Sequence, residues 1–229
     1  MHLMWHSRKT VTMKGTENMK YIKPADIEKR SFEIIKSEMR TNPPADEAPV
    51  LMRVIHTTAD FDYEENLVFS GGAVQAALEA FDRGAVVVTD TNMALSGINK
   101  KALEWLHIEA VCYMSNIEVA AEAQSRGVTR AAVSMEKAAR ITGKPLIFAV
   151  GNAPTALMRL ADLIEERTVS PALVIGVPVG FVNVTESKER IMETAENYIV
   201  ARGRKGGSNV AAAIVNALMY EKIDPGRNK

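Results

Sequence analysis

Five short apolar runs alternate with helical segments from Gly71 onward, and this order constrains the fold more than any other feature. The runs are rich in β-branched residues and begin near residues 85, 108, 145, 172 and 198. Each is continuously apolar, as expected of a strand that is covered on both faces. Strands separated by helices indicate a parallel sheet with right-handed crossovers. We therefore predict an α/β fold: a doubly wound, Rossmann-like, mainly parallel sheet of five strands with helices on both faces.

The chain before Gly71 is predicted to be a mainly helical N-terminal segment. The stretch PADIEKRSFEIIKSEMR, residues 24–40, spaces its apolar side chains at near-helical intervals and reads as a helix. The stretch VLMRVIHTT, residues 50–58, suits either a helical face or a strand, and we favour a helix with His56 near its C-terminal end. The stretch FSGGAV, residues 69–74, precedes a helix but follows no convincing strand.

Composition limits the classes of function. The chain has 229 residues, zero formal net charge and one cysteine, Cys112. Zero net charge gives no general attraction for nucleic acid or anionic membrane, and no apolar run approaches the ~20 residues of a membrane span. We expect neither partner, and the lone cysteine favours the cytoplasm. Residues 1–18 are polar and aperiodic, so we predict a disordered extension there and a single domain over residues 19–229.

Small and polar residues follow every apolar run. In open α/β sheets the ligand crevice lies beyond the carboxyl ends of the strands, so these segments are candidate site residues. They include Asp90, Asn152 and Gly180, within residues 89–97, 150–155 and 176–183. Strand-to-helix turns need Gly, Asn and Pro for their backbone angles in any case. Several such turns together at one predicted edge favour a site.

The stretch RGRKGGSN, residues 202–209, is the strongest of these turns. Gly206 and Gly207 would let the backbone approach a ligand, and Ser208 could cap the next helix, whose N–H groups would then form an anion site. Arg204 and Lys205 add positive charge. The order of a Walker A motif is missing, and no G-x-G-x-x-G follows the first strand. Nucleotide binding is therefore unsupported by motif, and carboxylates would suit the site as well as phosphates.

Metal and hydrolase motifs are missing from the sequence. His56 and His107 share no i, i+4 spacing and no H-E-x-x-H context, so we predict no metal site. There is no G-x-S-x-G elbow. His107 and Cys112 read as structural, and taken alone His56 also reads more often as a packing residue than as a chemical group.

Several segments together resemble the precorrin-8X methylmutase family, also called cobalt-precorrin-8 methylmutases, of corrin biosynthesis. The matching segments keep their order from about Tyr21 to Tyr220: RSFEII at 30–35, RVIHTT at 53–58, GNAPTAL at 151–157, GVPVGFV at 176–182 followed by ESK, and RGRKGGS at 202–208. Any one of these segments alone would be weak evidence, but GNAPTAL, VPVGFV and the R-x-x-H unit together are specific.

The resemblance implies an isomerase that moves a methyl group from C-11 to C-12 of precorrin-8 or cobalt-precorrin-8, formally a [1,5]-sigmatropic shift. It implies that His56 is the catalytic proton donor and that Arg53 and Ser31 contact the substrate. It further implies a homodimer, and no cofactor is signalled. Histidine is well suited to give a proton at neutral pH. The carboxylates of the tetrapyrrole substrate would suit Arg53, Arg204 and Lys205.

We therefore predict a catalytic residue, His56, and a set of substrate-binding residues: Ser31, Arg53, Thr57, Asp90, Asn152, Gly180, Arg204, Lys205, Gly207 and Ser208. A second hypothesis is a non-catalytic protein of the same fold that binds a tetrapyrrole or a nucleotide. The sequence leaves open whether the substrate contains cobalt, and whether His56 serves its own crevice or that of a dimer partner.

Overall fold

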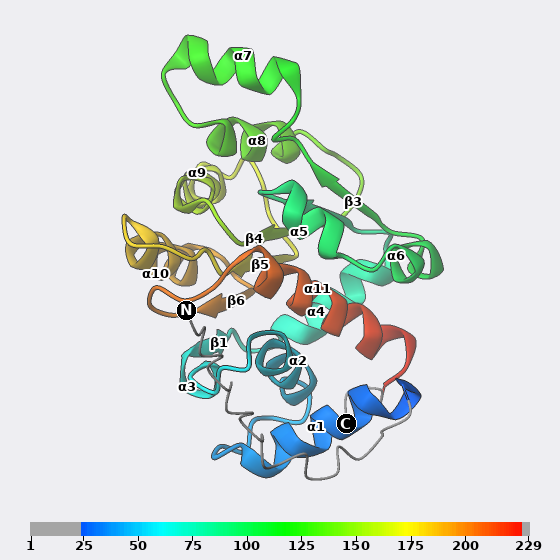
Figure 1. The fold of residues 1–229 in the computed structure, drawn as a ribbon. Coiled ribbons are helices and arrows are strands. Elements are labelled where there is room, and N and C mark those ends of the chain that lie inside the picture. The colour runs from blue at the N-terminus through cyan, green and yellow to red at the C-terminus, as the bar shows by residue number, and fades with distance from the viewer. Residues whose placement is uncertain (1–23, 226–229) are drawn as a thin grey trace, which may run out of the picture.

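The computed structural model describes residues 24–225 and has the predicted α/β architecture (Figure 1). Its helices are α1 (Pro24–Glu38), α2 (Ala48–Thr58), α3 (Tyr63–Asn66), α4 (Ala73–Asp82), α5 (Asn92–Gly97), α6 (Lys100–Leu106), α7 (Ile117–Arg126), α8 (Arg130–Ala139), α9 (Pro154–Glu165), α10 (Val184–Thr194) and α11 (Ser208–Ile223). Its strands are β1 (Leu67–Phe69), β2 (Val86–Thr89), β3 (Glu109–Cys112), β4 (Leu146–Val150), β5 (Leu173–Gly176) and β6 (Tyr198–Ala201). The predicted extension, residues 1–18, lies outside the described residues.

The sheet has six strands in the order β1-β6-β5-β4-β2-β3, so the prediction of five strands was wrong by one. Strands β2 to β6 are parallel to one another and correspond to the five predicted runs. The additional strand, β1, pairs antiparallel with β6, with Leu67 opposite Ala201. It has three residues and follows directly on a helical turn, which leaves too few positions for a periodic signal.

Alternate residues of the strands bury themselves against two different layers of helices. One layer contains α2, α4, α5, α6 and α11, and the other contains α8, α9 and α10 (Figure 1). Side chains toward the first layer include Val87, Ile147, Ile175 and Ile199; those toward the second include Val88, Phe148, Val174 and Val200. Burial on both faces explains why the strands are continuously apolar in sequence.

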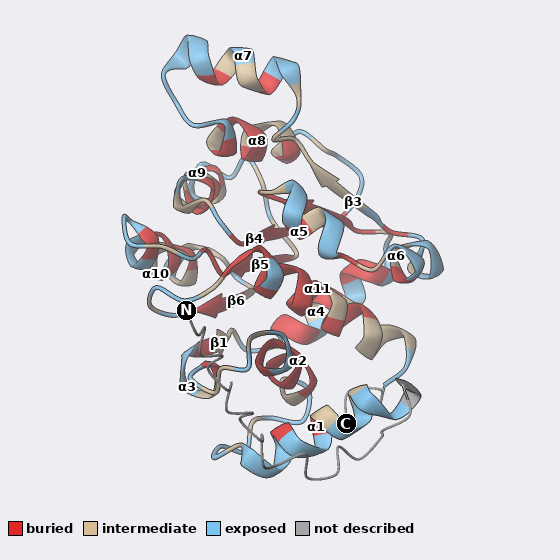
Figure 2. Ribbon diagram, in the orientation of Figure 1, coloured by how far each residue is buried: buried red, intermediate tan, exposed pale blue. Residues whose placement is uncertain are grey.

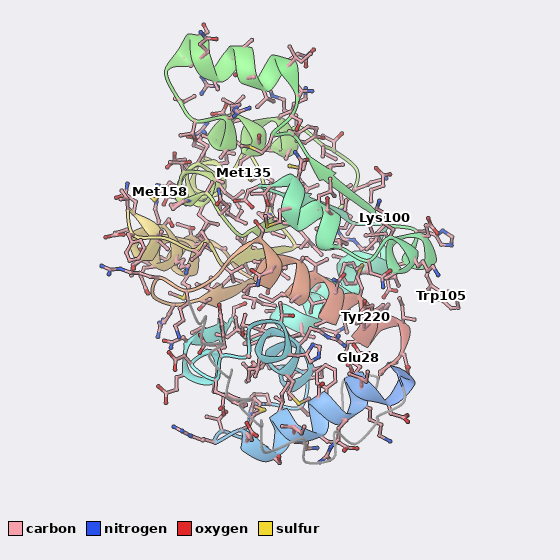
Figure 3. All side chains as sticks on the ribbon, in the orientation of Figure 1. Glu28, Lys100, Trp105, Met135, Met158 and Tyr220 are labelled. Carbon is pink, nitrogen blue, oxygen red and sulfur yellow. The ribbon has the colours of Figure 1, made fainter. Side chains whose placement is uncertain are left out.

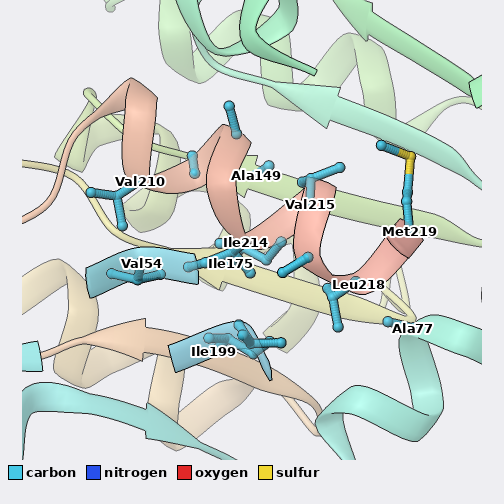
Figure 4. Close-up of a cluster of buried hydrophobic side chains, with 14 of the residues drawn as sticks. Val54, Ala77, Ala149, Ile175, Ile199, Val210, Ile214, Val215, Leu218 and Met219 are labelled. Carbon is cyan, nitrogen blue, oxygen red and sulfur yellow. The ribbon is translucent and has the colours of Figure 1, made fainter. Parts of the chain in front are cut away.

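Helix α11 lies at the centre of the first layer and is buried around most of its circumference (Figure 2). Its sequence, SNVAAAIVNALMYEKI, is apolar on nearly every face, which is typical of a helix enclosed by protein. Figure 4 shows Ile214 and Leu218 of α11 in one cluster with Val54 of α2 and Ile175 and Ile199 of the sheet. Helix α2 therefore packs against α11 within the same layer.

The two N-terminal helices match their predictions. Helix α2 starts with Pro49 in its first turn and ends at Ala59, whose left-handed backbone (φ 53°) places its N–H on the carbonyl of Ile55. His56 consequently lies in the last turn of α2, as predicted. Helix α1 packs across α2 and buries Phe32 and Ile35 against it (Figure 1). Within the described residues no helix is both long and apolar enough to cross a bilayer.

Helix α7 projects from the top of the molecule in Figure 1 and is mostly exposed (Figure 2). Apart from a small apolar cluster around Val119 and Ala123, charged groups connect it to α8 and α9. Arg126 of α7 donates to both carboxylate oxygens of Glu136 at 2.5 and 2.9 Å, and Nε of Arg159 donates to the same group at 2.7 Å. These two arginines, Arg126 foremost, lower the pKa of Glu136 to about 2.

Glu136→Gln is expected to lose stability mainly above pH 5. Because the pKa of Glu136 is depressed in the folded state, the ionised group stabilises the fold above its ordinary pKa, and this contribution disappears as pH falls from about 4.5 to 2. We expect the free energy of unfolding in urea to drop by roughly 1–2 kcal/mol at pH 7 after allowance for solvent screening, and by almost nothing near pH 2. Glu118→Gln, at an exposed pair with Lys137, is the control. An equal difference at every pH would contradict this account.

Candidate active site

The crevice expected between diverging strands is filled by the protein itself. The chain reverses its direction across the sheet between β2 and β4, where a ligand would normally bind. Asp90, at the end of β2, is fully buried there. Its carboxylate accepts the N–H groups of Gly151 at 2.9 Å, Asn152 at 2.8 Å and Ala153 at 2.7 Å. Asp90 thus holds the turn after β4, and its contact with a substrate stays a prediction.

Burial raises the pKa of the Asp90 carboxyl, while the three amide donors act in the opposite direction. The turn that it holds leaves the side chain of Asn152 exposed. Gly151 in the same turn lies directly against the start of α11, because a Cβ there would come within 2.7 Å of the Gly207 carbonyl oxygen. The turns after β4 and β6 therefore form one contiguous unit at the carboxyl edge of the sheet.

The start of α11 differs in detail from its prediction. Gly207, not Ser208, is the N-cap residue, and the helix has no side-chain cap. The Ser208 hydroxyl instead bonds the Thr91 hydroxyl at 2.8 Å, and Thr91 caps α5 by accepting the N–H of Ala94. The glycines serve the protein's own packing, since a Cβ on Gly206 would collide with the carbonyl oxygen of Val177. The backbone at Gly206 thus closely approaches the segment after β5. The sequence had instead predicted a close approach of this backbone to a ligand.

The segment from Gly203 to Gly206, which we call the basic turn, carries Arg204 and Lys205 on its exposed side. The Arg204 guanidinium lies over the ring of Phe181, 5.4 Å from its centroid, and the Arg204 carbonyl accepts the N–H of Gly180 at 3.2 Å. Gly180, Phe181 and Arg204 therefore belong to one surface. Phe181 lies inside the predicted segment 176–183, but the sequence did not predict it as a site residue.

Lys205 connects the basic turn to the segment that follows His56. Its ammonium donates to Asp60 at 2.6 Å and to Asp62 at 2.5 Å. The hydrogen bond to Lys205 lowers the pKa of Asp60, and both aspartates raise that of Lys205. The sequence RVIHTTADFDY gives no sign of this pairing, because Lys205 lies over 140 positions away. This pairing connects the segment that follows α2 to the basic turn at the carboxyl edge of the sheet.

A cavity of about 310 Å³ lies beside this connection. Its lining residues come from the segment after α2 and from the basic turn: Asp62, Tyr63, Asn66, Arg202, Gly203, Arg204 and Lys205. A second cavity, of about 730 Å³, lies between the N-terminal part of α2 and the segment after α1, and includes Met39 and Met52. It contains none of the predicted site residues.

His56 is exposed and is held by an aromatic neighbour. Its imidazole stacks on the Phe32 ring of α1, with centroids 5.3 Å apart and planes inclined by 22°. The Arg53 guanidinium lies 4.7 Å from the centroid of Phe32 and 5.1 Å from that of Tyr220. Phe32 therefore contacts both members of the R-x-x-H unit, and its buried ring supports the imidazole of His56.

Arg53, predicted as a substrate contact, is only 7% exposed and binds Glu28 of α1 at 2.5 Å. Figure 3 labels Glu28 on α1 and Tyr220 on α11, and both residues contact the buried guanidinium of Arg53. A buried arginine needs such partners because an uncompensated charge is costly. Ser31 is partly buried and donates to the Ile27 carbonyl at 2.9 Å, whereas Thr57 is exposed beside His56.

The structure thus separates the predicted residues into two groups. The accessible residues are His56, Thr57, Asn152, Gly180, Arg204 and Lys205, with Ser31 partly exposed, whereas Asp90, Gly207, Ser208 and Arg53 are buried. Exposed apolar side chains accompany the first group: Val179 at 49%, Phe181 at 81% and Val182 at 76%. A surface that combines cations, amides and exposed apolar groups suits a large, flat ligand with an apolar body and carboxylate arms.

His107 caps α6 with a left-handed backbone at the amino end of β3, and Cys112 is half-buried in that strand. Neither lies with the accessible group. Among residues 24–225 no three acidic, histidine or cysteine side chains come together in a way that could hold a metal ion.

An open α/β sheet with basic and amide groups at its carboxyl edge is typical of the doubly wound proteins that bind small molecules at that edge. A profile of the precorrin-8X methylmutase family matches residues 26–221. The chain belongs to the precorrin-8X methylmutase family. It is accordingly an isomerase of the methylmutase type.

Individual relatives agree with this assignment. The chain is 46% identical over 210 residues to the cobalt-precorrin-8 methylmutase of Salmonella typhimurium, covering 88% of this chain and 98% of the relative. It is 43% identical to the cobalt-precorrin-8 methylmutase of Priestia megaterium, covering 86% and 88%. The crystal structure of a precorrin-8x methyl mutase from Thermus thermophilus superposes with a TM-score of 0.81 at 39% identity, covering 88% and 99%.

Proposed function

We propose that the chain moves a methyl group from C-11 to C-12 of cobalt-precorrin-8 or precorrin-8 in cobalamin biosynthesis, with His56 as the proton donor. Membership in the methylmutase family supports the reaction. The observation that carries the role of His56 is its position: an accessible imidazole, stacked on buried Phe32, at the one end of α2 that Lys205 ties to the carboxyl edge.

The chemistry that His56 must supply is modest. The bond from C-11 to the methyl carbon breaks and the bond from C-12 forms, so the reaction is an isomerisation in which no atom is lost. A proton on the conjugated macrocycle favours the tautomer in which the methyl group migrates, and it returns to the protein or solvent afterwards. A positioned general acid of this kind contributes about 10²–10⁴-fold to the rate.

The remaining accessible residues suit the binding of the substrate. Its acetate and propionate arms would pair with Arg204 and Lys205 and accept hydrogen bonds from Asn152 and Thr57, and from Ser31 if its hydroxyl turns away from Ile27. The apolar macrocycle would lie against Phe181 and Val182, the two most exposed of the three apolar residues beside Arg204. Arg53 would support the site indirectly. It is buried against Phe32, the ring on which His56 stacks.

We favour the cobalt-containing substrate, because the relatives at 46% and 43% identity are both named for it. Two predictions from the sequence remain predictions: a homodimer, which light scattering would test, and a cytoplasmic location without nucleic-acid or membrane partners. The exposed side chains of Met93, Trp105 and Ile117 provide apolar surface that a second copy could cover (Trp105 is labelled in Figure 3).

The test is direct turnover of each substrate. The purified protein is incubated with cobalt-precorrin-8 and, separately, with precorrin-8, and the visible absorption spectrum is followed. We expect a product of unchanged mass whose spectrum has shifted and whose methyl group NMR places on C-12, with faster conversion of the cobalt form. Binding of either tetrapyrrole without conversion would instead support the second hypothesis, a non-catalytic binding protein.

A further inference from the structure

Lys188 of α10 is a buried charged residue that the reaction described above does not use. The residue is fully buried, and its ammonium group donates to the carbonyl oxygens of Gly203 at 2.8 Å and Lys205 at 2.9 Å. Burial of an ammonium is costly unless hydrogen bonds compensate it, and a well-packed apolar side chain would often be the more stable choice. Both observed bonds go to the basic turn.

The two carbonyls flank Arg204, so Lys188 holds the basic turn from its inner side. Few other contacts hold the basic turn in place. The N–H of Gly180 donates to the Arg204 carbonyl, and Gly206 packs on Val177. The Lys205 side chain donates to Asp60 and Asp62. With its carbonyls held inward, the turn presents the Arg204 and Lys205 side chains on its exposed face.

We infer that Lys188 is a positioning residue for substrate binding: it fixes the basic turn so that Arg204 and Lys205 meet the carboxylate arms of the substrate. Lys188 itself lies beneath the surface and touches no ligand. The inference rests on the proposed function, because it takes the tetrapyrrole carboxylates as the groups that Arg204 and Lys205 bind.

Lys188→Met tests this role, because methionine is unbranched, fits the buried volume and cannot donate hydrogen bonds. We expect KM for the tetrapyrrole substrate to rise about tenfold, equivalent to the loss of one charge-assisted contact, while kcat changes less than about twofold. Ile191→Ala is the matched control. Ile191 is fully buried on the same helix and packs in the core, so its loss destabilises α10 without removing a bond to the basic turn.

A second measurement keeps the roles distinct. Amide hydrogen exchange in a peptide covering residues 202–207 should accelerate at least about tenfold in Lys188→Met and remain unchanged in Ile191→Ala, both measured well below their unfolding temperatures. Lys188→Gln, which retains an N–H donor, should give an intermediate KM, and it substitutes for the methionine variant if that variant fails to fold.

The results separate the inference from the proposed function. If the unsubstituted protein converts neither tetrapyrrole, the proposed function fails. If it converts one of them, but Lys188→Met and Ile191→Ala alter KM equally, or the exchange of residues 202–207 stays unchanged in Lys188→Met, the positioning role of Lys188 is overturned while the methylmutase activity stands.

Discussion

Replacement of His56 by alanine is expected to lower kcat for the methyl shift by about 10²–10⁴-fold, the contribution of a positioned general acid. The substrate should still bind, because Arg204, Lys205 and the apolar residues around Phe181 are unchanged. Stability should change little, since the imidazole is exposed and its only described ring contact is the stack on Phe32. The measurement is single-turnover conversion followed by absorption, together with the thermal unfolding midpoint.

His107→Asn is the matched control for this experiment. His107 is likewise exposed, but it lies at the amino end of β3, and asparagine tolerates its left-handed backbone. The control should keep full activity. Normal turnover in His56→Ala would remove the histidine from the chemistry, and an equal loss in both variants would indicate a general effect on the fold.

Replacement of Asp90 by alanine should give the largest loss of stability among the predicted site residues. Three backbone N–H groups at the buried carboxyl edge would lose their acceptor at once. Each unsatisfied buried donor costs about 1–3 kcal/mol, and partial relaxation with water entry leaves a net loss of roughly 3–5 kcal/mol. Urea unfolding would measure the loss directly.

Asp90→Asn separates the acceptor from the charge, because its amide retains one oxygen that can accept part of the three hydrogen bonds. We expect about half of the loss seen for alanine. Asp162→Asn, on the partly exposed surface of α9, provides the control and should change the unfolding free energy only slightly. A loss below about 1 kcal/mol in Asp90→Ala would show that the turn after β4 holds itself in place without the carboxylate.

Sequence patterns predicted the sheet well where the pattern was long. The five parallel strands and the helical form of residues 50–58 follow from continuous apolar runs and from the spacing of Val50, Leu51, Val54 and Ile55. Strand β1 was missed because its three residues gain their strand conformation from pairing with β6, which lies 130 positions further along. A tertiary partner of that kind leaves no local signal.

The sequence predicted which turns lie at the carboxyl edge of the sheet, but it did not predict the contacts that their side chains make. Polar turns after parallel strands predicted a site at one edge, since the carboxyl ends of the strands meet there, and that site stays a prediction. The sequence could not tell that Asp90 faces inward onto three amides or that Ser208 pairs with Thr91, because both depend on how neighbouring turns dock. Lys188 and Phe181 went unnoticed for the same reason: their partners are the carbonyls and the guanidinium of a distant turn.

The position of α11 in the chain has a consequence for biogenesis. This enclosed helix, residues 208–223, packs against α2, α4, α5, α6 and the sheet, all of which are synthesised before it. Until it emerges from the ribosome, the inner surface of α2 and the matching face of the sheet have nothing to cover them. The domain can therefore complete its core only after nearly the whole described chain has been translated. Until then its apolar surface is accessible to chaperones.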